Sequence, residues 1–125
     1  SRRFHSKIDG GFFRATTAPN AAALQLRLRP AALVKRPAAR DNASGLFQAA
    51  LKFILAQHRL VEPLYQLEKE KKLSVETPTA GRAFMEGQLL KGSQMLGDLW
   101  FTAWKEAPPD RYLQSYLAKR KLEKK

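Results

Sequence analysis

The pattern of apolar and polar positions divides the chain into an irregular first third and a helical remainder. Residues 1–43 contain three prolines and the Gly10-Gly11 pair, and the runs between these breakers are too short to sustain a long helix. The pattern predicts an extended irregular arm, except for a short helical turn that Asn20 could cap and Pro30 ends. The large apolar residues of the arm should dock on another surface: Phe4, Phe12, Phe13, Leu24, Leu26 and Leu28.

A helical period begins near residue 44. From there, residues suited to one helix face recur three or four positions apart: Phe47, Leu51, Ile54, Leu55, His58, Val61 and Tyr65. Ser44 or Asn42 is the expected N-cap. Pro63 lies inside the pattern, so the helix should either kink there or stop and restart through residues 64–72.

A second long helix is predicted from Thr77-Pro78 to about Glu106, because threonine caps helices well and proline suits the first helical position. Its apolar stripe is Met85, Leu89, Gly92, Leu96, Trp100 and Ala103, widened by Leu99 and Trp104. Four glycines fall inside this helix: Gly81, Gly87, Gly92 and Gly97. Each costs about 1 kcal/mol relative to alanine, and we expect the close approach of another backbone to compensate.

Pro108-Pro109 ends this helix, and Asp110 is well placed to cap a third, shorter one. The short connection at residues 73–77 predicts an antiparallel hairpin, with the third helix folding back across its open end. The expected fold is therefore all-α: a helical hairpin of two long helices plus a short C-terminal helix, with an extended irregular N-terminal arm. The expected division is a basic extended arm (1–43), a small helical domain (44–122) and a basic tail end (123–125).

The net charge of +12 is concentrated at the two ends of the chain. Residues 1–40 carry nine basic side chains and one acid, residues 41–110 carry eight and nine, and residues 111–125 carry six and one. A neutral body with cationic ends indicates anchoring to a polyanion, although basic tails that are simply solvated are the alternative. The candidate RNA- or anion-binding residues are Arg2, Arg3, Arg14, Arg27, Arg29, Lys35, Arg36, Arg40, Lys119, Arg120, Lys121, Lys124 and Lys125.

Few residues could carry out catalysis. The chain has no cysteine, which excludes disulfides, cysteine-ligated metals and thiol nucleophiles. Of its two histidines, His5 and His58, the second lies on or beside the apolar face of the first long helix, where we expect a partly buried structural role. Neither a Gly-rich phosphate loop nor a carboxylate pair can be assembled from the spacing. We expect no enzyme activity, no cofactor, no metal and no small-molecule substrate.

The aromatic cluster Trp100, Phe101 and Trp104 is the candidate protein interface. The competing interpretation places Trp100 and Trp104 in the core, because they lie at helical spacing, and it is the one we favour for these two residues. Phe101 points off their stripe, and so it is the better candidate for contact with a partner subunit.

The start of the chain, Ser1-Arg2-Arg3-Phe4-His5-Ser6, is similar to the end of a mitochondrial presequence near its cleavage site. It predicts a mitochondrial location, in the matrix or on the matrix side of the inner membrane. The longest apolar run falls short of the roughly 20 residues that span a bilayer. We expect a structural accessory subunit of a large mitochondrial assembly, first a ribosomal protein that contacts rRNA through its tails. The alternative is a supernumerary subunit of a respiratory complex or the ATP synthase, whose basic ends face a membrane surface.

Overall fold

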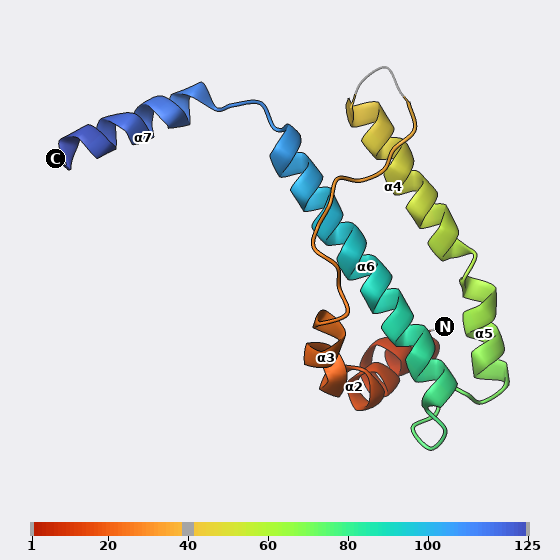
Figure 1. Ribbon diagram of the computed structural model, residues 1–125. Helices are drawn as coiled ribbons and strands as arrows, with labels where there is room; N and C mark the ends of the chain where they lie inside the picture. Colours follow the sequence, from red (N-terminus) through yellow and green to blue (C-terminus); the bar gives the residue numbers. More distant parts are fainter. Residues whose placement is uncertain (1, 39–41, 125) are drawn as a thin grey trace.

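The computed structural model describes residues 2–38 and 42–124 (Figure 1). It is 74% helical, and within the described residues the only β-type pairing is an isolated bridge between Ser74 and Thr77. The helical elements are, in chain order, α1 (Arg2–His5), η1 (Ser6–Phe12), α2 (Phe13–Thr16), η2 (Ala18–Asn20), α3 (Ala21–Gln25), α4 (Asn42–His58), α5 (Val61–Lys69), α6 (Thr79–Glu106) and α7 (Arg111–Glu123). The prediction of an all-α protein is confirmed.

The predicted irregular arm is wrong for residues 2–20, most of which are helical. The short helical turn predicted after Asn20 is confirmed as α3, although the Asn20 side chain donates to the Thr16 carbonyl and does not cap α3. α1, the wide π-type helix η1 and α2 follow one another without interruption, with Gly10 and Gly11 inside η1. Packing offsets the cost of the glycines, because Ile8 and Phe12 bury themselves against Leu73 in the main apolar cluster. An extended conformation remains in residues 28–38, which we call the strap. The rest of the predicted arm, residues 39–41, lies outside the described part.

A small apolar core holds the N-terminal helices against α5 and α6. Phe12 and Leu73 are almost fully buried at its centre, and the residues packed around the cluster are Phe4, Leu64, Leu67 and Met85. The Phe4 ring also stacks on Tyr65, with 5.0 Å between ring centroids. Docking of the apolar arm residues is therefore confirmed for Phe12, whereas Leu26 is exposed.

The break between α4 and α5 follows from Pro63. α4 ends at His58 and α5 begins at Val61, so the predicted helix stops and restarts. The break lies before Pro63 because proline lacks the N–H that would bond the carbonyl of residue 59, and its ring crowds that carbonyl. Pro63 itself sits in the first turn of α5, where a backbone N–H has no helical partner.

α6 begins two residues later than predicted, at Thr79, and Thr77 does not cap it. The Thr77 amide donates instead to the Ser74 carbonyl at 3.2 Å, and its hydroxyl donates to the Lys71 carbonyl at 3.3 Å. Both bonds close the turn before the helix. The end of α6 at Glu106 agrees with the prediction.

The two long helical segments run antiparallel, with α5 packed on α6 (Figure 1). α4 and α6 instead form facing walls of an open cavity, which the strap also lines. A hairpin closed along its whole length is therefore not what the structure shows.

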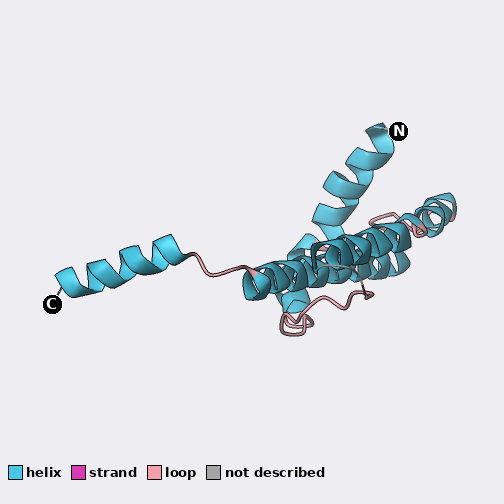
Figure 2. Ribbon diagram, turned by 90° about the horizontal axis from the view of Figure 1, so that it is seen from above, coloured by secondary structure: helices cyan, strands magenta, loops and turns pink. Residues whose placement is uncertain are grey.

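α7 projects away from the other helices in both views (Figures 1 and 2). Asp110 caps it as predicted, since its carboxylate accepts a hydrogen bond from the Leu113 amide at 2.9 Å. The expectation that α7 folds back over the hairpin is wrong. The extended backbone of Ala107 and Asp110, with two stiff prolines between them, directs the helix outward.

Gly81 occupies a position that excludes a side chain. A Cβ atom there would lie 2.5 Å from the Lys72 carbonyl oxygen, 2.7 Å from the Phe12 ring and 2.9 Å from a Leu73 methyl group. The predicted close approach of another backbone is thus confirmed at Gly81. At Gly87 and Gly92 an added Cβ meets nothing within 4 Å.

We predict that Gly81→Ala lowers the free energy of unfolding by about 1–3 kcal/mol, the usual cost of overpacking. The matched substitution Gly92→Ala should raise it by up to about 1 kcal/mol, because alanine favours the helix and meets open space. Denaturant unfolding of the full chain, followed by circular dichroism, measures both values. Equal effects of the two substitutions would contradict the packing around Gly81.

Candidate interaction surfaces

The strap is attached to α6 by side chains that bond its backbone. Gln94, Asp98 and Thr102 are spaced four residues apart and therefore share one face of α6; we call them the polar ladder. Gln94 exchanges two hydrogen bonds with the backbone of Arg29 (3.1 and 3.2 Å), Asp98 accepts from the Ala32 amide (3.0 Å), and the Thr102 hydroxyl accepts from the Val34 amide (2.8 Å). Three backbone amides of this extended segment thus donate hydrogen bonds to side chains of a helix, not to a neighbouring strand.

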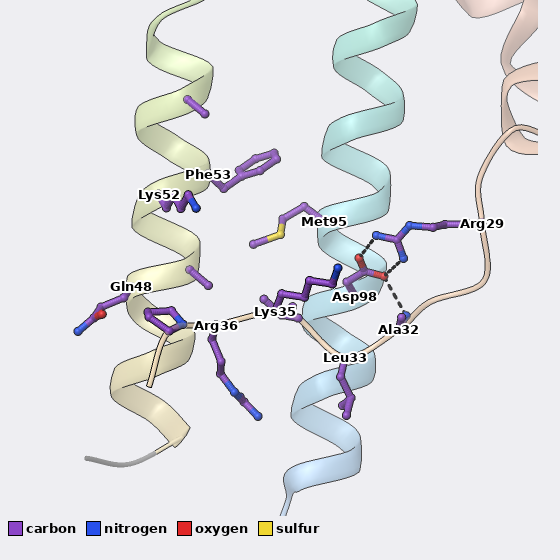
Figure 3. Close-up of a pocket in the computed structure, with 14 residues that line it drawn as sticks. Arg29, Ala32, Leu33, Lys35, Arg36, Gln48, Lys52, Phe53, Met95 and Asp98 are labelled. Carbon is purple, nitrogen blue, oxygen red and sulfur yellow. Dashed lines mark hydrogen bonds and ion pairs between the residues drawn. The ribbon is translucent and has the colours of Figure 1, made fainter. Parts of the chain in front are cut away.

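Asp98 is the centre of this attachment. The residue is 6% exposed, and the Arg29 guanidinium binds both carboxylate oxygens, at 2.7 and 3.3 Å (Figure 3). Burial works against the charged carboxylate, but hydrogen bonds from Ala32, Arg29 and Gln94 and the positive charge of Arg29 outweigh it. The pKa of Asp98 is consequently lowered from its ordinary value of 3.8.

Two further arginines of the N-terminal segment pair with acids of α6. Arg36 binds both carboxylate oxygens of Glu106, and Arg27 lies 3.6 Å from Glu86. Three of the predicted anion-binding arginines, including Arg29, therefore neutralise carboxylates of the same chain.

The remaining predicted cations fall into two groups. Arg3, Arg14 and Lys35 are exposed, and no carboxylate in the described residues pairs with them. The cations of α7 are also exposed and lack a described acidic partner: Lys119, Arg120, Lys121 and Lys124. Arg40, Lys125 and the side chain of Arg2 lie outside the described part. The structure thus does not bring the predicted cations into one site.

A cavity of about 980 Å³ lies between α4, α6 and the strap (Figure 3). Phe53 from α4 and Met95 from α6 point into it from opposite walls. Lys35 and Lys52 add positive charge, and among the described acids neither has an ion-pair partner. The cavity therefore suits an apolar segment that carries negative charge.

The apolar stripe predicted for the first long helix faces outward. Its exposed members are Phe47, Leu51, Ile54, Leu55, Val61 and Tyr65. The accessible surface of the protein is 10160 Å², whereas a compact monomer of its 14.1 kDa mass exposes about 6,700 Å². The protein thus exposes surface, including these apolar side chains, that a compact monomer of its mass would bury.

The placement of Trp100 and Trp104 in the core is wrong. Their exposed fractions are 70% and 74%, whereas Phe101 is partly buried. The polar ladder occupies the buried side of this part of α6 in their place. The sequence did contain a signal for it, the four-residue spacing of Gln94, Asp98 and Thr102, but a helix normally buries its apolar stripe.

Neither histidine is buried in the described part of the chain. His58, expected to be partly buried, is exposed, as is His5. In residues 2–38 and 42–124, no group of three or more His, Cys, Asp or Glu side chains is arranged to hold a metal ion.

No family model, no curated protein and no solved structure matches the chain. Across the described helices, none combines the length and apolarity needed to cross a membrane.

We predict that Asp98→Asn releases the strap, because it leaves Arg29 without a counter-charge and weakens a buried hydrogen-bonded pair by about 1.5–3 kcal/mol. Hydrogen exchange of the Ala32 and Val34 amides, corrected for intrinsic rates, measures the local opening. Because the Asp98 pKa is lowered in the fold, its stabilisation is present above pH 3.8 and is lost as the pH falls below that value. The asparagine variant should lack this pH dependence.

Glu86→Gln is the matched control for Asp98→Asn. It removes one negative charge from the same helix. Glu86 pairs with Arg27 at 3.6 Å and with Arg82 at 2.9 Å, but these arginine side chains are 60% and 46% exposed and neither belongs to the strap, and such pairs contribute about 0–1 kcal/mol. Strap exchange in this control should stay close to that of the unaltered chain. Equal loss of protection in both variants would show that helix charge in general, not the Asp98 contacts, holds the strap.

Proposed function

We propose that the chain is a structural accessory subunit of a large mitochondrial assembly and acts by being bound, without catalytic turnover. The observation that carries this proposal is the uncovered apolar surface of the two long helical segments. An exposed apolar area of this extent is typical of a protein that is buried among partners. In the assembly, the α4–α5 and α6 segments act as a helical hairpin whose outer faces pack on neighbouring subunits.

The assembly that we propose first is the mitochondrial ribosome. Phosphates of rRNA are the natural partners for cations that the fold leaves without carboxylates, in particular Arg3, Arg14 and those of α7. Binding would release counterions from the RNA and would not depend on base sequence. The mitochondrial location itself rests on the Arg-rich start of the chain.

A second candidate is a supernumerary subunit of a respiratory complex or the ATP synthase. It is favoured by Trp100 and Trp104, whose exposed rings lie near the end of α6 together with Lys105. The Lys105 ammonium is 5.9 Å from the centroids of both the Phe101 and Trp104 rings. Exposed tryptophan next to lysine is typical of proteins at a membrane–water interface.

Separating these candidates requires the tagged full chain in its native mitochondria, fractionated before and after ribonuclease treatment. We predict that the chain sediments with a ribosomal particle and is released when the RNA is digested. Retention in a detergent-solubilised inner-membrane complex after digestion would favour the second candidate instead. Migration as a free monomer before any treatment would contradict both.

We also predict that replacing Trp100 and Trp104 with serine removes the chain from its particle while leaving its own stability unchanged within about 0.5 kcal/mol, since substitutions of exposed residues rarely exceed that value. Loss of large aromatic anchors typically weakens an interface by about 2 kcal/mol or more each. Co-purification and thermal unfolding are the two measurements. Tyr65→Ser is not a suitable control, because Tyr65 stacks on Phe4. Leu26→Ser is a suitable control, because Leu26 is 87% exposed and lies outside both long helices.

A further inference from the structure

α7 buries none of its residues in the described structure. It has 13 residues, all exposed, and a helix of that length is marginal in water even with favourable residues. The Asp110 cap contributes about 1 kcal/mol, which stabilises the first turn only. A partner molecule that stabilises the remaining turns of α7 must therefore be complementary to its surface.

That surface changes character from one end of the helix to the other. Tyr112, Tyr116 and Arg120 of α7 and Lys124, the residue that directly follows the helix, are spaced four residues apart and form one stripe, about 18 Å long at 1.5 Å per residue. The Arg120 guanidinium lies 5.9 Å from the centroid of the Tyr116 ring. The stripe thus presents two exposed phenol rings followed by two cations.

We propose that this stripe binds a single-stranded segment of RNA, with the tyrosine rings stacking on unpaired bases and Arg120 and Lys124 pairing with phosphates. Base–aromatic stacking combined with cations along the backbone is the usual chemistry of single-strand recognition. The inference rests on the proposed RNA-bound function and makes it specific. It assigns the main RNA contact to α7, because Arg27, Arg29 and Arg36 already pair with acids of α6.

Two other locations at which α7 could bind are less complementary to its surface. The cavity between α4 and α6 carries Lys35 and Lys52, which repel a helix with so many cations of its own. A helix lying in a membrane surface needs an apolar face along its whole length. In α7 that face is interrupted, because Arg120 and Lys124 continue the stripe begun by the tyrosines and would lie in the apolar layer.

The test is fluorescence anisotropy of a labelled single-stranded oligouridine with the purified full chain, repeated over a range of salt concentrations. Tyr112→Leu combined with Tyr116→Leu keeps the surface apolar but removes stacking. Arg120→Gln combined with Lys124→Gln removes two phosphate contacts. Each pair of substitutions should weaken binding at least about tenfold. The Arg120 and Lys124 variant should also reduce the slope of log affinity against log salt concentration by about 1.4, because each phosphate contact of a single strand contributes about 0.7.

Arg59→Gln combined with Lys91→Gln is the matched control, since it removes the same charge from exposed positions outside α7 that we assign to no RNA contact. It should bind oligouridine within about threefold of the unaltered chain, because exposed charges beyond about 10 Å are screened at 0.1 M salt. Circular dichroism verifies that all variants fold alike, which the exposure of these side chains favours.

Two results would overturn the inference, and they differ in what they mean for the proposed function. If the unaltered chain binds oligouridine but neither variant pair of the α7 stripe loses affinity, α7 is not the contact, yet the RNA-bound function stands. If the unaltered chain ignores oligouridine and binds vesicles of phosphatidylcholine and cardiolipin instead, the inference and the ribosomal proposal fall together.

Discussion

The pairing of Asp98 with Arg29 and the Ala32 amide is the contact on which the arrangement of the protein depends. It places a carboxylate in a nearly buried position on α6, where a charge is tolerated only if hydrogen bonds and an opposite charge compensate for lost water. Because the strap supplies both, it lies along α6 (Figure 1). The strap then lines the cavity together with α4 and α6.

This polar attachment also explains why so much apolar surface points outward. A helix that buries Asp98 and Thr102 beneath the strap turns Trp100 and Trp104 to the other side. The core is consequently small and lies near the start of α6, around Phe12 and Leu73. The strongest internal packing is therefore at one end of the described structure, and much of the apolar surface of the long helices is exposed.

The two basic segments of the chain differ in what their charges do. In the N-terminal segment, Arg27, Arg29 and Arg36 face acids of α6, so part of the positive charge holds the fold together. α7 has no such acids beside it in the described structure, and its cations face solvent. A count of charges along the chain does not distinguish the two segments. The ion pairs do, because the three arginines of the N-terminal segment bind carboxylates of the same chain, whereas the cations of α7 bind none in the described structure.

The sequence by itself predicted those structural features whose physical cause lies within about four residues along the chain. The Asp110 cap, the break before Pro63 and the end of α6 ahead of Pro108 all follow from a single hydrogen bond or a proline ring acting on its own turn. The helical conformation of residues 2–20, the use of Thr77 in a turn and the outward position of Trp100 depended on tertiary contacts. The burial of the polar ladder also depended on tertiary contacts, because Asp98 is buried by a strap that lies more than sixty residues away in the chain. Periodicity identifies a helix face, but which face becomes buried depends on what packs against it.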